Sequence, residues 1–169
     1  ILLRKNKLIG FNTDYIASKM ILKKIVVKKN ILLLGDGAVA KTIYIALKNL
    51  KFNNVYLCSR KKRYNDWKLT KNTKILHWND RENHISNFLI NATPIGMKKK
   101  DNFPISENKV KLFKIIFDFF INDKNILKKY ADKYKIKYIG GKEFSFYQAY
   151  EQFKIYTNMN ISRNRLKKF

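Results

Sequence analysis

The sequence lacks several features that would place it in other protein classes. It has one cysteine, Cys58, and two histidines, His77 and His84, among 169 residues. A single cysteine excludes an internal disulfide and a cysteine-rich metal site, and the histidine spacing supports no metal site with a carboxylate or thiolate. No apolar run approaches the about 20 residues that span a bilayer, and no export signal opens the chain. We therefore expect a cytoplasmic protein that binds neither metal nor membrane.

Acidic residues are also scarce: 12 stand against 37 basic ones, which gives a formal net charge of +25. Such a charge favours contact with nucleic acid. However, 31 of the basic residues are Lys and only 6 are Arg, whereas groove and phosphate recognition relies on Arg. Lys, Asn, Ile, Phe and Tyr are all encoded by A/T-rich codons, so nucleotide bias explains the charge without a binding role. A basic nucleic-acid-binding module stays open as an alternative.

Short apolar segments alternate with helical patterns along the chain. Strands are predicted at 31–34, 55–58, 74–78, 88–90, 114–120 and 137–139, and helices at 15–27, 42–50, 125–135 and from 144 past 156. The alternation predicts an α/β fold with a Rossmann-like, doubly wound parallel sheet. Thr13 is the expected N-cap of the first helix. We expect residues 13–169 to form one domain and residues 1–12 to be a linker or strand remnant of a preceding domain.

A glycine-rich segment, Gly35-Asp36-Gly37-Ala38-Val39-Ala40, joins the first predicted strand of the sheet to a helix. This G-x-G-x-x-A pattern is typical of dinucleotide-binding turns, in which the backbone and the helix N-terminus hold the pyrophosphate. An ordinary strand-to-helix turn is the alternative. Asp36 disfavours a pyrophosphate unless its side chain points away.

The second strand of this unit ends in Ser59-Arg60-Lys61-Lys62-Arg63, where NAD-binding enzymes usually carry Asp or Glu for the ribose 2′-hydroxyl. A cluster of cations without an acid suits a 2′-phosphate, and Arg60 could also stack on adenine. The pattern therefore predicts NADP(H) as the cofactor. A solvated basic turn is the alternative in so Lys-rich a chain.

Five motifs, in order along the chain, resemble motifs of the shikimate dehydrogenase family. One of them, Ser59-Arg60-Lys61, is part of the basic segment described above. They are Gly10 to Asp14 (G-x-N-T-D), Ser59-Arg60-Lys61 (N-R-T in the family), Ile90 to Met97 (I-N-A-T-P-x-G-M), Asp118 (the first residue of D-x-x-Y-x-P) and Gly141 to Gln148 (G-x-x-M-L-x-x-Q). The glycine-rich segment resembles the family's G-A-G-G-A loop. The resemblance covers nearly the whole chain.

This resemblance implies NADPH-dependent reduction of 3-dehydroshikimate to shikimate. It implies that Asp14 contacts the substrate and pairs with a catalytic Lys of a preceding domain, that Gln148 binds the substrate, and that Thr93, Phe119 and Gly141 lie at the nicotinamide end of the cofactor. Without the resemblance, Asp14 would be a helix-terminal acid and Gln148 a solvated residue.

The chain departs from the family pattern at several positions. Ile121 and Asp123 replace a Tyr and a Pro, Phe144-Ser145 replaces Met-Leu, and no counterpart of the family's substrate-binding domain precedes Ile1. We therefore expect that domain upstream or on a separate chain, with the carboxyl-terminal helix packing towards it, and an isolated chain without activity. A degenerate relic that binds NADP without catalysis is the second alternative, and use of quinate stays open.

Overall fold

The computed structural model describes residues 1–26, 29–61, 63–96, 103–122 and 125–166. Its centre is a six-stranded sheet in the order β5-β4-β3-β6-β7-β8, and every neighbouring pair is parallel. The strands are β3 (Lys29–Leu34), β4 (Asn53–Cys58), β5 (Thr73–Leu76), β6 (Phe88–Asn91), β7 (Ile115–Asp118) and β8 (Lys137–Gly140). The predicted doubly wound parallel sheet is confirmed. The strand order reverses between β3 and β6: β4 and β5 follow on one side of β3, and β6, β7 and β8 on the other.

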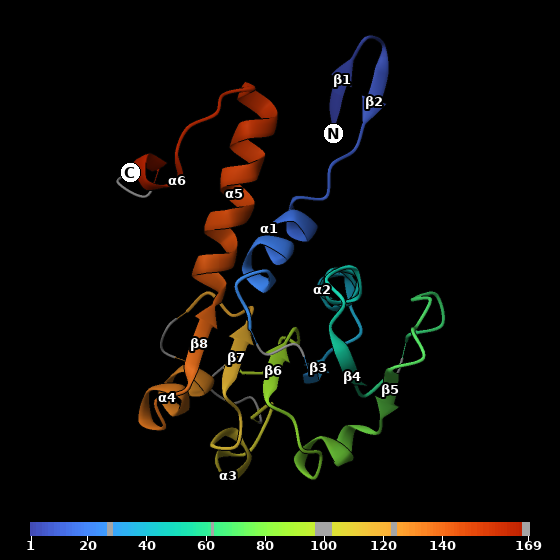
Figure 1. Ribbon diagram of the computed structural model, residues 1–169, viewed down its shortest axis with the longest axis vertical. Helices are drawn as coiled ribbons and strands as arrows, with labels where there is room; N and C mark the ends of the chain where they lie inside the picture. The colour runs from blue at the N-terminus through green and yellow to red at the C-terminus, as the bar shows by residue number, and fades with distance from the viewer. Residues whose placement is uncertain (27–28, 62, 97–102, 123–124, 167–169) are drawn as a thin grey trace.

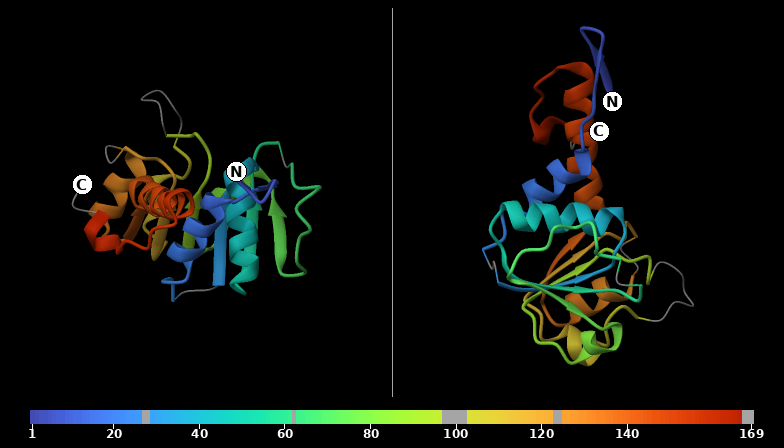
Figure 2. Two further views of the ribbon diagram at one scale, coloured as in Figure 1. Left: turned by 90° about the horizontal axis from the view of Figure 1, so that it is seen from above. Right: turned by 90° about the vertical axis from the view of Figure 1, so that its right-hand side faces the viewer.

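Helices cover both faces of this sheet (Figures 1 and 2). The longer ones are α1 (Thr13–Leu22), α2 (Ala38–Asn49), α4 (Ile126–Lys133) and α5 (Gly141–Thr157), and the shorter ones are η1 (Trp78–Glu82), α3 (Glu107–Val110) and α6 (Arg163–Leu166). Side chains of β3 alternate between the two faces: Ile31 and Leu33 join a buried cluster under α1, α2 and α5, while Leu32 and Leu34 join a second cluster under α3 and α4. Both faces are therefore buried, as a continuously apolar strand predicts.

Residues 1–12, expected as a linker or strand remnant, contain an antiparallel hairpin of β1 (Leu2–Arg4) and β2 (Lys7–Ile9). The hairpin and the carboxyl-terminal half of α5 project together beyond the layer of α1 and α2 (Figure 2, right). Leu3 and Leu8 of the hairpin are exposed. No helix within the described residues is long and apolar enough to cross a membrane.

Several predicted element boundaries were wrong. The N-cap of α1 is Asn12, whose side chain accepts a hydrogen bond from the Tyr15 backbone N–H at 2.8 Å, so Thr13 is already helical. The helix ends at Leu22, well before the predicted end at Val27, which lies outside the described residues. Helix α2 begins four residues earlier than predicted and α5 three residues earlier, because Gly37 and Gly140 serve as caps through their backbone alone.

The start of α5 depends on a glycine with no room for a side chain. A Cβ atom at Gly141 would stand 2.5 Å from the Phe119 carbonyl oxygen and 2.8 Å from the Phe120 carbonyl carbon. The Gly141 N–H also donates to the Phe120 carbonyl at 3.1 Å. Both contacts are backbone atoms of the loop after β7, which cannot move aside as a flexible side chain would. Gly141 therefore sets how closely α5 approaches this loop.

We predict that Gly141→Ala lowers the free energy of unfolding by about 1–3 kcal/mol, the usual cost of overpacking a closed site. Gly10→Ala is the matched control, because Gly10 is exposed, lies in no helix or strand, and a Cβ there meets nothing within 4 Å. The control should change stability by no more than about 0.5 kcal/mol. Urea unfolding of the two variants measures the difference, and equal midpoints would contradict the steric account.

Candidate functional site

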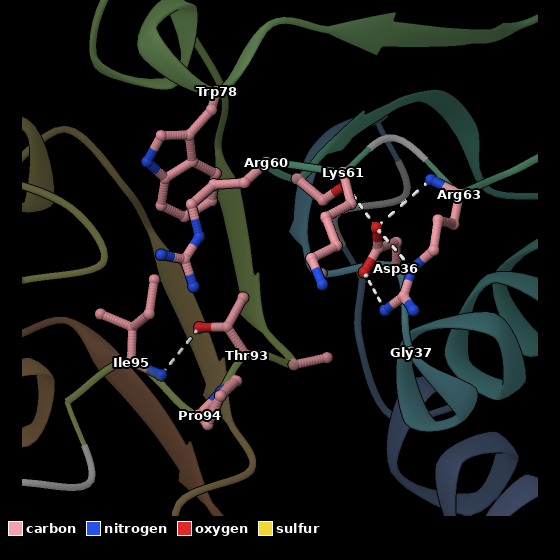
Figure 3. A pocket seen from close by; sticks show the side chains of 12 residues that line it. Asp36, Gly37, Arg60, Lys61, Arg63, Trp78, Thr93, Pro94 and Ile95 are labelled. Carbon is pink, nitrogen blue, oxygen red and sulfur yellow. Dashed lines mark hydrogen bonds and ion pairs between the residues drawn. The ribbon is translucent and has the colours of Figure 1, made fainter.

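A pocket of about 300 Å³ lies at the carboxyl ends of β3, β4 and β6. Its lining comes from three turns, one after each strand, together with Trp78 (Figure 3). The lining residues are Gly35, Asp36, Gly37, Ser59, Arg60, Lys61, Arg63, Trp78, Ala92, Thr93, Pro94 and Ile95. This is the edge, and the point of reversed strand order, at which open α/β sheets bind ligands. Eight of the residues predicted for the cofactor site meet here.

The glycine-rich turn has the geometry that its sequence requires. Gly35 has φ +121°, and a Cβ atom there would stand 2.8 Å from the Ala92 carbonyl oxygen. Gly37 caps α2 without a side-chain hydrogen bond, and the first turn of α2 contains no acidic residue. The positive end of the helix dipole therefore has no carboxylate of its own in that turn. Ala38 and Val39 form this first turn, so the segment fits an anionic group such as a pyrophosphate.

The basic residues after β4 divide into two groups. Arg60 and Lys61 are exposed and extend into the pocket, whereas Arg63 folds back onto Asp36 (Figure 3). The Asp36 carboxylate accepts hydrogen bonds from the Ser59 hydroxyl at 3.0 Å and from the Arg63 backbone N–H at 3.2 Å, and it forms an ion pair with the Arg63 guanidinium at 3.3 Å. Burial opposes ionisation, but these donors outweigh it and hold the Asp36 pKa below its ordinary value. The carboxylate thus points away from the glycine-rich turn, as a pyrophosphate there requires. Lys62 lies outside the described residues.

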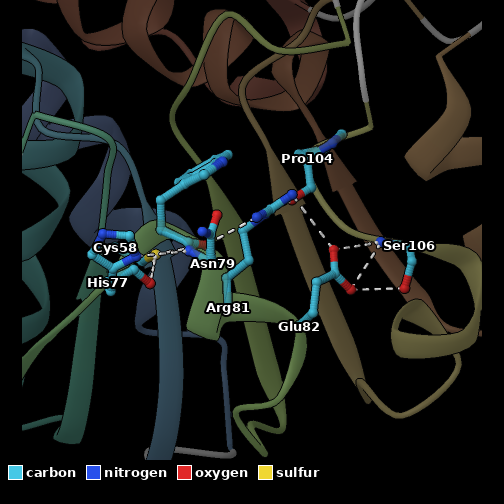
Figure 4. A network of polar contacts seen from close by, with 8 residues as sticks. Cys58, His77, Asn79, Arg81, Glu82, Pro104 and Ser106 are labelled. Atoms are coloured by element: carbon cyan, nitrogen blue, oxygen red, sulfur yellow. Dashed lines mark hydrogen bonds and ion pairs between the residues drawn. The ribbon is translucent and has the colours of Figure 1, made fainter.

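Trp78 is a pocket residue that sequence reasoning missed. Residues 74–78 were predicted as one strand, but β5 ends at Leu76 and Trp78 opens η1. The Arg81 guanidinium lies 4.2 Å from the centre of the indole and donates to the Trp78 and Pro104 carbonyl oxygens, each at 2.9 Å (Figure 4). Glu82 accepts a further hydrogen bond from the Ser106 hydroxyl at 2.7 Å. This network holds the indole at the wall of the pocket, where a flat ring could stack on it.

The turn after β6 is held by a buried polar network. The Asn91 side chain accepts hydrogen bonds from the Thr93 backbone N–H at 3.2 Å and its hydroxyl at 2.7 Å, and donates to Asp118 at 3.1 Å. Asp118 also accepts from the Phe120 N–H at 3.3 Å and the Tyr138 hydroxyl at 3.2 Å. Burial raises the pKa of Asp118 to about 6, although these hydrogen bonds act in the opposite direction. The network joins the ends of β6, β7 and β8.

The remaining predicted residues lie outside this pocket lining. Phe119 stacks on Phe117, with ring centroids 4.5 Å apart, and Gly141 contacts the same loop. Asp14 stands in the first turn of α1, where its backbone carbonyl accepts the Ser18 hydroxyl, and Gln148 is a half-buried residue of α5. Helices α1 and α5 pack against each other. Met97 and Asp123 lie outside the described residues.

Comparison with known proteins relates this site to one enzyme family. Shikimate dehydrogenase (NADP+) from Pelagibacter ubique is 35% identical over 160 residues, which cover 90% of this chain and 59% of that enzyme. The corresponding enzyme from Methanococcus maripaludis is 30% identical over 173 residues, which cover 93% of this chain and 60% of the enzyme. The chain is homologous to the shikimate dehydrogenases. It spans about three fifths of the length of these relatives. No protein-family model matches it.

Solved structures agree with this relationship. The chorismate mutase/shikimate 5-dehydrogenase fusion protein of Clostridium acetobutylicum superposes with a TM-score of 0.81 at 27% identity, over 94% of this chain and 60% of that one. A shikimate dehydrogenase solved in complex with NADP+ superposes with a TM-score of 0.78 at 26% identity, over 98% and 63%. The resemblance inferred from the motifs, including its fit to the carboxyl-terminal NADP-binding half, is confirmed.

We predict that Asp118 makes stability depend on pH between about 4 and 6. Its pKa is raised from 3.8 to about 6 in the folded protein. The folded state then holds a proton that the unfolded state has lost, so this group's contribution to stability falls as pH rises through that window. Asp118→Asn removes the effect. The free energy of unfolding of the variant, relative to that of the parent, should therefore rise by up to about 3 kcal/mol between pH 4 and pH 7.

Urea unfolding of both proteins at pH 4, 5, 6 and 7 measures this difference. Asp66→Asn is the control, because it removes an exposed carboxylate whose pKa is lowered by a hydrogen bond from Lys41. The control should not reproduce the rise. Parallel stability curves for Asp118→Asn and the parent would refute the role of burial at this position.

Proposed function

We propose that this chain supplies the NADP-binding half of an enzyme that reduces 3-dehydroshikimate to shikimate. The observation that carries the proposal is the pocket at the reversal of strand order, where a glycine-rich turn, a helix N-terminus without a side-chain cap and two exposed cations face the same space. The relatives are NADP+ enzymes, in agreement with the cofactor expected from the basic residues after β4. When bound, NADPH would supply the hydride for the reduction.

The residues present fit this cofactor. The backbone from Gly35 to Val39 would hold the pyrophosphate, because the open space at Gly37 lets a ligand approach the main chain. Arg60 and Lys61 would bind the 2′-phosphate, with Ser59 and Arg63 beside them. Thr93, Phe119 and Gly141 would line the nicotinamide end, a role that rests on the family resemblance.

The substrate half would come from another domain, upstream in the same polypeptide or on a separate chain. The relatives are longer than this chain by the length of such a domain. The hairpin and α5 carry exposed apolar side chains at the end where they project, namely Leu3, Leu8 and Tyr156. This exposure supports docking of the substrate domain at that end. Asp14 would orient a Lys of that domain at the reacting oxygen, and Gln148 would contact the substrate.

NADPH should bind more tightly than NADH, and Arg60→Ala should remove much of the preference. Loss of one charge-assisted contact to the 2′-phosphate costs on the order of 1–3 kcal/mol. Titration of nucleotide fluorescence measures both affinities. Arg163→Ala is the matched control, because Arg163 is an exposed arginine that packs over Tyr147 and does not line the pocket. An equal loss of affinity for both nucleotides in Arg60→Ala, or a preference of the parent protein for NADH, would rule out a role of Arg60 in distinguishing NADPH from NADH.

The isolated chain should not reduce 3-dehydroshikimate with NADPH. The developing alkoxide needs a proton donor, a carboxylate at neutral pH is a poor one, and general acid–base groups contribute about 10²–10⁴-fold. Adding the amino-terminal domain of the Pelagibacter ubique enzyme should restore turnover, and Asp14→Asn should then lower kcat by at least about 100-fold.

Three outcomes of this assay separate the alternatives. Nucleotide binding without turnover, even with the added domain, favours a relic that has lost catalysis. Turnover by the isolated chain that Asp14→Asn leaves unchanged would mean that the catalytic residues have been misassigned. Turnover that requires both the added domain and Asp14 supports the proposed function.

A further inference from the structure

Asp36 places a carboxylate at the boundary between the glycine-rich turn and the basic residues after β4. Its side chain is 12% exposed, whereas that of Arg63 is 63% exposed, so the carboxylate is the anchored partner and the guanidinium lies over it. Both Asp36 oxygens are used: Oδ2 accepts from the Arg63 Nε at 3.4 Å and Oδ1 from Nη2 at 3.3 Å. With the backbone N–H of Arg63, three donors of one residue converge on one carboxylate.

This pair changes the charge that a ligand meets in the pocket. The sequence predicts a run of cations for a 2′-phosphate, but the charge of Arg63 is offset by Asp36 at ion-pair distance. No carboxylate of the described residues forms an ion pair with Arg60 or Lys61, and both line the pocket. Asp36 is itself a lining residue of the same pocket, and its carboxylate would repel any phosphate placed near Arg63.

We infer that Asp36 is a specificity-determining residue that weakens the preference of this site for NADPH over NADH. This inference rests on the proposed cofactor. Asp36 acts by holding Arg63 out of the 2′-phosphate contact and by adding a negative charge beside it. Arg60 and Lys61 then carry most of the preference. The 2′-phosphate is the part of the cofactor affected, because NADH has a neutral hydroxyl there.

The opposite role would be that Asp36 orients the Arg63 guanidinium for the phosphate. The geometry disfavours that role, since the Nε and Nη2 edge of the guanidinium, which grips an oxyanion with two parallel hydrogen bonds, is already occupied by Asp36. A phosphate would have to displace the carboxylate or bind the remaining donors beside it. The two roles predict opposite effects of removing the charge of Asp36.

The experiment measures the ratio of the NADH dissociation constant to the NADPH dissociation constant by calorimetry at fixed salt. Asp36→Asn should raise this ratio about tenfold, the effect of releasing one charge-assisted contact. Arg63→Ala alone should lower the ratio, because it leaves the Asp36 carboxylate beside the 2′-phosphate without its cationic partner. In the Asp36→Asn background, Arg63→Ala should lower the ratio about tenfold, back towards the parent value.

Asp66→Asn is the matched control, because it also removes one acidic charge that is paired with a cation, Lys41, but does not line the pocket. It should leave the ratio unchanged, and unfolding midpoints establish that each variant is folded. A ratio that is unchanged or lowered in Asp36→Asn overturns this inference, even if the parent prefers NADPH. Failure of the parent to bind either nucleotide overturns the proposed function as well, so the two failures are distinguishable.

Discussion

The carbonyl oxygen of Ala92 leaves no room for a side chain at Gly35, because a Cβ atom there would stand only 2.8 Å from this oxygen. This close backbone approach occurs between β3 and β6, the adjacent strands at which the order of the sheet reverses. The Gly35 N–H donates to the Cys58 carbonyl and the Ala92 N–H to the Leu34 carbonyl, both at 2.9 Å. The turns after three strands are therefore fixed relative to one another by main-chain contacts. The pocket lies between these turns, and the close contact of the turns after β3 and β6 requires glycine at position 35.

The formal charge of +25 says little about this pocket. At physiological salt, exposed charges are screened beyond about 8 Å, so a ligand responds mainly to the groups that line its site. There, one of the few acidic residues of the chain offsets one of its few arginines. Codon bias can raise the number of lysines everywhere, but it does not place Asp36 against Arg63. The local arrangement of charges, and not their total, is the feature that bears on function.

The sequence was sufficient for the features that depend on local pattern. Apolar runs such as Ile31 to Leu34 predicted strands buried on both faces, and the glycine spacing predicted the turn at the pocket. It was insufficient where the deciding contact is distant along the chain. Asp36 meets Arg63 only because β3 and β4 are neighbours. Trp78 reaches the pocket only because η1 follows the edge strand β5 and Arg81 packs on its ring. Helix starts were misplaced because glycine backbone caps carry no side-chain signal.

Burial in this molecule separates the elements that fold together from those that project. The two clusters on either side of the sheet are closed by α1, α2 and α5 on one face and by α3 and α4 on the other. The hairpin and the end of α5 stand outside both clusters, and Leu3, Leu8 and Tyr156 on them are exposed. In the proposed function, nucleotide binding would depend on the closed part, whereas chemistry on a substrate would depend on what meets the projecting part. The two properties are therefore separable by experiment, because a change in the core should alter binding and a change in the projecting elements should not.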